Sequence, residues 1–469
     1  MQHCRTKIVC TLGPSSETRE AIRQLMEAGL NVARINFSHG THAQHAATIA
    51  AVREVAESMQ RPVAIMGDLQ GPRIRIGELP APITLVDGSD IRFAPESDVQ
   101  SGELPLTYEE LANDVHVGDR ILINDGLIEL VVLDVEPPRV VARVLHGGIL
   151  TSHKGINLPG VRVSAPSITD KDREDIGFAV KQNLEYLALS FVRKAEDITE
   201  LRSLIPKGLL VVAKIEKDSA LENIESIIMA ADVVMVARGD LGVELPFEEV
   251  PFAQKRIISL CNRLGRPVIT ATQMLESMIT HPRPTRAEAS DVANAIIDGT
   301  DAVMLSAETA AGQYPRLAVE AMSRIIHEIE RRSLFLHRRG DDRRRPDTAF
   351  STEFAIAAAS YAAVSMLGAP CLIVFTKSGF SARVVASQRP QVPILVLTDQ
   401  TRTYRQLAMV WGVVPELVGH CDTYDEMVRL ALAAVRRREL AKPGERVVVT
   451  AGVPFDVPGT TNMIKVETV

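Results

Sequence analysis

Short apolar runs alternate with amphipathic stretches along most of the chain, and each run ends at a cluster of polar residues. Residues 231–237 (ADVVMVA) are rich in Val and contain one polar residue, Asp232. This composition predicts a strand buried on both faces, as in parallel sheets. The run leads directly into Arg238-Gly239-Asp240. Polar residues at this point indicate that the strand end faces a ligand, because a glycine lets backbone amides approach an anion.

The same alternation predicts eight strand–helix units. Eight such units close into a (β/α)8 TIM barrel, whose active site lies at the carboxyl ends of the strands. The polar clusters of the eight units, such as those at 38–40, 214–216 and 238–242, stand at such ends. Strands are expected at 7–11, 32–37, 63–66, 186–192, 209–213, 232–237, 267–270 and 302–305, and the helices that follow them at 18–28, 43–59, 169–182, 195–204, 219–229, 247–264, 286–298 and 315–330.

The alternation of strand and helix patterns is interrupted in two places. Between residues 73 and 164, short β-patterned runs at 83–86, 90–93, 120–123, 126–133 and 140–145 are broken by Gly, Pro and Asp, which predicts a small β-rich insertion after the third strand. After a charged, Pro-containing joint at 333–348, a helix at 353–366 and strands at 371–375, 394–397 and 446–450 predict a second α/β region. We therefore expect a barrel over 1–71 and 165–335, an inserted β-barrel domain over 72–164 and a C-terminal α/β domain over 349–469.

Composition narrows the class of partner. The formal net charge of −7 and an aromatic content of 4% argue against nucleic acid as the main partner, so any anion must be bound by locally placed cations. The five cysteines show no paired or metal-ligand spacing. We see no signal peptide and no apolar run long enough to span a bilayer, so we expect a cytoplasmic protein that binds no membrane.

Two neighbouring strand ends carry candidate catalytic groups. The run at 209–213 leads into Lys214-Ile215-Glu216, and alternation on an extended chain places Lys214 and Glu216 on the same side. Together with Asp240 they offer an ammonium and two carboxylates, whose oxygens suit Mg²⁺. An isolated Lys-x-Glu is more simply a salt bridge, but similar clusters at other strand ends favour a metal-assisted site for a phosphorylated or carboxylated substrate. Thr272, after the strand at 267–270, could contact a carboxylate or relay a proton.

The second and third strands add further polar groups. Alternation places Arg34, Asn36 and Ser38 on one strand face. Asn36, Ser38 and Asp68 provide oxygen atoms with one formal charge, which suits a monovalent cation better than a transition metal. His39 could be a general base, although a structural hydrogen bond is the simpler interpretation.

Two features lie outside the predicted barrel mouth. The turn at 376–381 stands between a strand and a helix start, which suits phosphate binding by hydroxyls and helix amides; a simple N-cap is the alternative. The Arg-rich linker at 331–345 could contact nucleic acid or a partner, but the acidic whole favours a solvated linker or a subunit contact.

Ten stretches of the chain resemble the pyruvate kinase family. They are residues 6–14 (TKIVCTLGP), 34–40 (RINFSHG), 67–75 (GDLQGPRIR), 154–160 (KGINLPG), 214–216 (KIE), 235–242 (MVARGDLG), 270–278 (TATQMLESM), 284–287 (PTRA), 298–305 (DGTDAVML) and 306–312 (SAETAAG). The resemblance implies a barrel, a lid domain inserted after the third strand and a C-terminal regulatory domain. It also implies transfer of the phosphoryl group of phosphoenolpyruvate to ADP, giving pyruvate and ATP.

Carried over to matching positions, the resemblance implies a role for each candidate residue. Lys214 would stabilise the phosphoryl group in flight, and Glu216 and Asp240 would hold Mg²⁺ or Mn²⁺. The other implied assignments are Gly239, Asp240 and Thr272 for the substrate carboxylate; Arg34 and Arg75 for phosphates; Arg34, Asn36, His39, Arg75 and Lys154 for the nucleotide; Thr272 and Ser306 for the water that protonates the enolate; Asn36, Ser38, Asp68 and the carbonyl of Leu69 for K⁺; and Thr376, Lys377, Ser378, Gly379, Phe380 and Ser381 for an effector.

Some positions depart from the family pattern. Many members have a Glu at the position of Arg73, which accompanies K⁺ dependence, whereas a Lys there accompanies independence from K⁺. Arg73 carries a permanent charge, so we predict activity without added K⁺. Phe380 stands where some members have a basic residue, and Asp456 adds negative charge to the loop at 452–462. The identity of the effector therefore stays open between a sugar phosphate and a nucleotide monophosphate. A homotetramer is implied, and we expect no further domain after Val469.

Two other functions are compatible with a barrel of this kind. One is an aldolase or lyase that acts on a pyruvate-like enolate with Mg²⁺, which would need neither Lys214 nor the insertion. The other is a catalytically inactive metabolite sensor, against which the intact Lys214, Glu216, Asp240 and Thr272 weigh.

Overall fold

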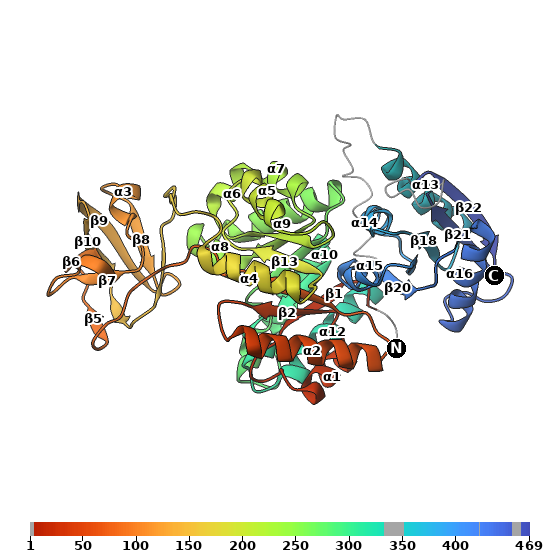
Figure 1. The fold of residues 1–469 in the computed structure, drawn as a ribbon, viewed down its shortest axis with the longest axis horizontal. Helices are drawn as coiled ribbons and strands as arrows, with labels where there is room; N and C mark the ends of the chain where they lie inside the picture. Colours follow the sequence, from red (N-terminus) through yellow and green to blue (C-terminus); the bar gives the residue numbers. More distant parts are fainter. Residues whose placement is uncertain (1–3, 333–350, 422, 453–460) are drawn as a thin grey trace.

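The computed structural model describes residues 4–332, 351–421, 423–452 and 461–469. A β-rich unit, a central barrel and a C-terminal α/β unit follow one another along the long axis of the molecule (Figure 1). The expectations for the joint at 333–348 and for most of the loop at 452–462, including Asp456, lie outside the described residues.

Within the described residues, eight parallel strands close into a barrel in the order β1-β17-β16-β15-β14-β13-β3-β2. The predicted (β/α)8 barrel is therefore confirmed. Its strands are β1 (Lys7–Thr11), β2 (Val32–Asn36), β3 (Ala64–Asp68), β13 (Tyr186–Leu189), β14 (Leu210–Ile215), β15 (Val233–Ala237), β16 (Val268–Ala271) and β17 (Ala302–Leu305).

Helices surround the barrel, and one expected helix is divided. In place of a single helix over 219–229, α6 and α7 meet at Asn223, whose side chain donates to the backbone carbonyls of Arg193 and Ser219 at 3.1 and 3.3 Å. An Asn that bonds to the backbone in this way competes with the helix. None of the described helices is long and apolar enough to cross a membrane. The barrel helices are α1 (Arg19–Ala28), α2 (His42–Ser58), α4 (Asp170–Lys181), α5 (Ala195–Leu204), α6 (Asp218–Glu222), α7 (Ile224–Ala230), α8 (Arg238–Glu244), α9 (Val250–Arg263), η2 (Glu276–Ile279), α10 (Arg286–Asp298), α11 (Ala307–Ala310) and α12 (Pro315–Arg331).

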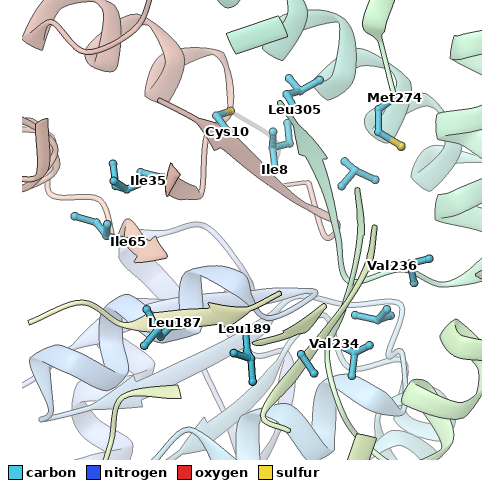
Figure 2. Packing of buried hydrophobic residues seen from close by; sticks show 14 of the residues in the cluster. Ile8, Cys10, Ile35, Ile65, Leu187, Leu189, Val234, Val236, Met274 and Leu305 are labelled. Atoms are coloured by element: carbon cyan, nitrogen blue, oxygen red, sulfur yellow. The ribbon is translucent and has the colours of Figure 1, made fainter. Parts of the chain in front are cut away.

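Two apolar layers fix the direction of each strand side chain. One layer packs between the strands and the helices, and Figure 2 shows members of it from strands all round the barrel, such as Leu187 and Val234. The other fills the barrel interior and includes Val212 and Met235. Because Val212 points inward and successive side chains alternate, β14 also points Lys214 inward. Lys214 therefore lies on the interior face of the barrel.

The insertion forms a seven-stranded sheet in the order β4-β12-β8-β9-β10-β6-β7 and a separate pair, β11-β5. It contains its own apolar core. Several of its strands have only two or three residues, which is too short for a periodic pattern to predict. Its elements are β4 (Ile74–Arg75), β5 (Ile83–Leu85), β6 (Asp90–Pro95), η1 (Glu96–Asp98), β7 (Leu104–Leu106), α3 (Leu111–Asp114), β8 (Arg120–Ile123), β9 (Ile128–Glu136), β10 (Arg139–His146), β11 (Gly148–Leu150) and β12 (Gly155–Asn157).

The C-terminal unit has a five-stranded sheet in the order β20-β19-β18-β21-β22. It covers the amino end of the barrel: Ala408 and Met409 belong to the same apolar cluster as the barrel interior, and Lys7 Nζ donates to the carbonyl of Val413 at 2.9 Å. Its elements are α13 (Thr352–Leu367), β18 (Leu372–Phe375), α14 (Phe380–Ser387), β19 (Ile394–Thr398), α15 (Thr401–Gln406), η5 (Leu407–Met409), β20 (Val413–Leu417), α16 (Tyr424–Arg437), β21 (Arg446–Ala451) and β22 (Met463–Thr468).

Candidate active site

Lys214 and its neighbours form a compact charged cluster at the carboxyl end of the barrel. The ammonium Nζ lies 2.7 Å from Glu216 Oε1 and 3.3 Å from Asp68 Oδ1, and it donates to Ser190 Oγ at 2.7 Å. The side chains of Lys214, Glu216 and Asp68 are 8%, 0% and 2% exposed. The expectation that Lys214 and Glu216 share one side of the strand is confirmed.

The pKa values of the cluster follow from burial and from charge. Burial alone disfavours the ammonium of Lys214, but the carboxylates of Asp68 and Glu216 outweigh it and raise the pKa. At Asp68, burial opposes ionisation, but Lys214 and Arg34 together lower the pKa. Burial raises the pKa of Glu216 more than Lys214 lowers it, and Asp240 adds to the rise. Lys214 therefore stays charged at neutral pH.

Glu216 and Asp240 fit a divalent cation. Glu216 Oε2 accepts from the backbone N–H of Phe191 at 2.6 Å, whereas Oε1 is buried and makes no well-aligned hydrogen bond. Asp240 is close enough to influence the pKa of both Lys214 and Glu216. Among the described residues no three His, Cys, Asp or Glu side chains gather as a metal cage. Such a pair suits Mg²⁺, which is commonly held by one or two carboxylates together with substrate phosphates.

Arg34 is held beside this cluster by a buried carboxylate. Its Nε and Nη2 lie 2.7 and 2.6 Å from Asp68 Oδ2, and its Nη1 donates to Thr11 Oγ1 at 2.9 Å. Its side chain is 12% exposed. One carboxylate therefore fixes the positions of two cations, Arg34 and Lys214.

The candidate K⁺ ligands largely have protein partners. Asn36 Oδ1 accepts from the backbone N–H of Ser38 at 3.1 Å, and the carbonyl of Leu69 accepts from Ser190 Oγ at 2.7 Å. Asp68, as described above, faces two cationic side chains. The set therefore offers fewer free oxygens than its residue types suggest.

Thr272 follows β16 in a strained conformation. The φ angle of Thr272 is 67°, a value that a β-branched residue rarely adopts, and the φ angle of Gln273 is also positive, at 53°. Arg238 Nη2 donates to the carbonyls of Thr272 and Gln273 at 2.9 and 3.2 Å and thereby holds the turn. Thr272 Oγ1 accepts from the backbone N–H of Gly239 at 2.6 Å. The first turn of α8, with Gly239 and Asp240, is thus tied to the end of β16.

Further basic groups lie on the side of the barrel mouth where the insertion begins. Burial first, then the charges of Arg73, Arg75 and Arg34, lower the pKa of His39. Arg75 is on β4 and donates to the carbonyl of His153 at 3.2 Å. Because β4 pairs with β12 at Arg75 and Gly155, Lys154 stands next to this pairing. The candidate nucleotide residues Arg34, His39 and Arg75 are therefore brought near one another.

Ser306 lies at the end of β17, the strand that pairs with β16. Its backbone N–H donates to Glu308 Oε2 at 2.7 Å, and Glu308 Oε1 accepts from the backbone N–H of Leu275 at 3.1 Å. Ser306 and Thr272 therefore follow neighbouring strands at the same end of the barrel.

The candidate effector turn is well formed in the C-terminal unit. Thr376 Oγ1 accepts from the backbone N–H of Gly379 at 3.0 Å, and Ser378 Oγ accepts from that of Phe380 at 3.4 Å. Lys377 Nζ is 3.7 Å from Asp399 Oδ2, and Ser381 Oγ is 2.5 Å from Thr461 Oγ1. This geometry agrees with both interpretations of the turn, the cap and the phosphate site.

Sequence reasoning did not name Ser190 as a site residue, and it noted Arg238 at a strand end without giving it a role. Ser190 bridges Lys214 and the carbonyl of Leu69, and Arg238 supports the turn at Thr272. Both directly follow barrel strands, so their position was a usable signal, but their partners lie on other strands and could not be assigned from one sequence.

Family models and similar known proteins all carry the same family name. A family model described as "Pyruvate kinase, barrel domain" matches residues 3–319, and one described as "Pyruvate kinase, alpha/beta domain" matches residues 354–467. A pyruvate kinase of Geobacillus stearothermophilus is 47% identical over 473 residues, covering 99% of this chain and 80% of the relative. Pyruvate kinases of Staphylococcus saprophyticus and Staphylococcus aureus (strain MRSA252) are both 44% identical with the same coverage.

Proposed function

The chain belongs to the pyruvate kinase family and is a phosphotransferase, and on this premise we propose that the cluster around Lys214 transfers the phosphoryl group of phosphoenolpyruvate to ADP. The observation that carries the proposal is the Lys214 ammonium, buried and 2.7 Å from Glu216 Oε1. In the reaction the bond between phosphorus and the enol oxygen breaks, and an oxygen of the terminal phosphate of ADP bonds to the phosphorus. The electron pair of the broken bond stays on the enol oxygen.

Lys214 would stabilise the phosphoryl group between the two oxygens. The transition state of phosphoryl transfer is loose and spreads negative charge over the phosphoryl oxygens, so positioning and charge stabilisation dominate catalysis. The raised pKa of Lys214, which its carboxylate neighbours cause against the effect of burial, keeps the ammonium charged for this role. Arg34 would contact the same phosphoryl group from the side of Asp68.

Glu216 and Asp240 would hold the divalent ion, Mg²⁺ or Mn²⁺, that the family generally uses. Such an ion supplies positive charge to the phosphoryl and enolate oxygens when it is bound. The buried Glu216 Oε1, which lacks a well-aligned hydrogen bond, supports this assignment.

The first turn of α8 and Thr272 would bind the substrate carboxylate. The backbone N–H of Gly239 now donates to Thr272 Oγ1, and a carboxylate oxygen would replace that acceptor. A Cβ at Gly239 would lie 3.4 Å from Thr272 Oγ1, so glycine leaves room for the close approach. Arg238, through its bonds to the Thr272 turn, would keep this pocket in shape.

The enolate left by phosphoryl transfer must gain a proton at its terminal carbon to become pyruvate. We assign this proton to a water near Thr272 and Ser306, since both hydroxyls follow neighbouring strands at the barrel mouth. Arg34, Asn36, His39, Arg75 and Lys154 would face the nucleotide phosphates.

We also propose that activity does not require added K⁺, although the family generally uses this ion. Arg73, Arg75 and Arg34 all act on the pKa of His39, so fixed positive charge already gathers beside Asn36, Ser38, Asp68 and Leu69. The protein partners of these oxygens support the same conclusion.

The remaining proposals concern regulation and assembly. A sugar phosphate or nucleotide monophosphate would bind at the turn at 376–381, the chains would form a homotetramer in the cytoplasm, and the domain boundaries would be those expected from the sequence. Calorimetric titration with either class of ligand tests the effector site: binding that Lys377→Ala and Ser381→Ala leave unchanged would exclude this turn.

A coupled assay with phosphoenolpyruvate, ADP and Mg²⁺ tests the proposed function. We expect formation of pyruvate and ATP in equal amounts. An aldolase or lyase would consume a pyruvate-like substrate without forming ATP, and a metabolite sensor would bind substrate without turnover. Either result would contradict the proposal.

A further inference from the structure

One buried carboxylate joins the insertion to the barrel. The side chain of Glu244, the last residue of α8, is 1% exposed, and its Oε1 accepts from Lys217 Nζ at 2.5 Å and from Asn157 Nδ2 at 3.1 Å. In the part of the chain that the structure describes, the Asn157 bond is the one hydrogen bond between residues 74–158 and the barrel. Nearer the end of the insertion, Arg193 Nη1 of the barrel donates to the carbonyl of Val163. Next to it, a Cβ at Gly126, in the turn between β8 and β9, would lie 3.8 Å from Val243 Cγ1.

The three bonded residues are each close in sequence to a candidate site group. Lys217 directly follows Glu216. Glu244 ends the helix whose first turn carries Asp240. Asn157 ends β12, three residues after Lys154, and β12 pairs with β4 at Arg75. A shift of Asn157 relative to Glu244 therefore moves the candidate phosphate-binding groups relative to the candidate metal-binding groups.

We propose that Glu244 is a positioning residue that sets the angle of the insertion over the barrel, with Asn157 as the releasable half of the contact. The proposal rests on the proposed function. The amide of Asn157 is neutral, so its release leaves Glu244 paired with Lys217, whereas a buried carboxylate without any cation would be strongly destabilising. The other oxygen, Oε2, is buried and has no hydrogen-bond partner among the described residues. The carboxylate can therefore accept a further bond as the insertion closes.

Asn157→Ala tests the contact. We expect the KM for ADP to rise about tenfold, since a hydrogen bond to a charged group stabilises the closed arrangement by roughly that factor. The KM for phosphoenolpyruvate and the kcat at saturating ADP should stay within about twofold, because those depend on groups of the barrel. Asn113→Ala is the matched control: its amide bonds to Glu110 within the insertion, and we expect no change.

A reciprocal exchange separates positioning from a merely structural role. Asn157→Asp alone places two carboxylates side by side and should raise the KM for ADP more than Asn157→Ala does. The double variant Asn157→Asp/Glu244→Gln again has one amide and one carboxylate, with the carboxylate now at position 157. It should bring the KM for ADP back to within about threefold of wild type.

Three results would overturn the proposal: an unchanged KM for ADP in Asn157→Ala, a parallel rise in both KM values, or no rescue in the double variant. Calorimetric titration of ADP into the same proteins distinguishes this failure from failure of the proposed function. A wild type without turnover would refute the function, while a tenfold loss of ADP affinity in Asn157→Ala would still support the contact.

Discussion

The two ends of the barrel each bury a lysine, and the two lysines differ in their surroundings. Lys214, at the carboxyl end of β14, lies 2.7 Å from Glu216 Oε1 and 3.3 Å from Asp68 Oδ1. Lys7, at the amino end of β1, is 6% exposed and donates to the backbone carbonyl of Val413. Burial lowers the pKa of Lys7 to about 8, whereas the carboxylates outweigh burial at Lys214 and raise its pKa.

This difference shows that position inside a barrel does not by itself give a lysine a function. At the amino end, Ala408 and Met409 fill the space below the strands, and Lys7 joins two units through a neutral acceptor. At the carboxyl end, the buried Asp68 Oδ1 and Glu216 Oε1 make no well-aligned hydrogen bonds. A site that binds both a phosphate and a cation needs charges of both signs. Lys214 has two carboxylates beside its ammonium, whereas Lys7 donates to a neutral carbonyl.

The largest expected difference between the two lysines is in turnover. Lys214→Met should lower kcat by about 10³–10⁵-fold, as does loss of other cations that stabilise the transition state of phosphoryl transfer. Lys7→Met should keep kcat within about twofold, because Lys7 lies at the opposite end of the barrel. Steady-state assays with saturating substrates measure both. Equal losses in the two variants would remove the distinction between the ends.

The pH dependence of stability sharpens the comparison at the amino end. In the unfolded chain Lys7 should have its ordinary pKa near 10.5. In the folded protein its pKa is about 8, so it loses its proton at a lower pH. Between these values the unfolded state binds more protons, so the free energy of unfolding rises with pH. Between pH 7.5 and pH 10 the free energy of unfolding of wild type should rise by about 2 kcal/mol more than that of Lys7→Met. Chemical denaturation of both proteins at the two pH values measures it, and a parallel pH dependence would refute the lowered pKa.

The smallest expected effect concerns Arg73 at the carboxyl end. Arg73→Glu reverses a charge that acts on His39 and Arg75, and we expect K⁺ to stimulate this variant about tenfold. Wild type should be unaffected by K⁺. Rates in K⁺-free buffer, with and without KCl, measure both proteins. A wild type that is inactive until KCl is added would show that Arg73 does not replace the ion.

Periodicity in the sequence was sufficient for the barrel and for part of the site. Residues that alternate along a strand share a face, which places Lys214 beside Glu216 without knowledge of any neighbour. The strand ends also indicated Arg34, Asp68, Asp240 and Thr272 as candidates, because parallel strands in a barrel end at one rim.

What the sequence did not reveal depends on contacts between distant segments. The short strands β4 and β12 have two and three residues, which is too few for a period, yet β4 carries Arg75 and its pairing with β12 places Lys154 next to it in the chain. Arg238 bonds to the carbonyl of Thr272 across 34 positions, and the bond between Asn157 and Glu244 spans 87 positions. Such pairings are set by tertiary packing, and local pattern carries no information about them.

Glu216 and Asp240 are proposed to hold the divalent ion against the phosphoryl group that Lys214 stabilises. The most direct test is the relaxation of the phosphorus nucleus of phosphoenolpyruvate by Mn²⁺ bound to the protein. We expect strong relaxation in wild type and in Lys214→Met at saturating substrate, and loss of this relaxation in Glu216→Gln and in Asp240→Asn. Relaxation that persists after both carboxylates are replaced would contradict it.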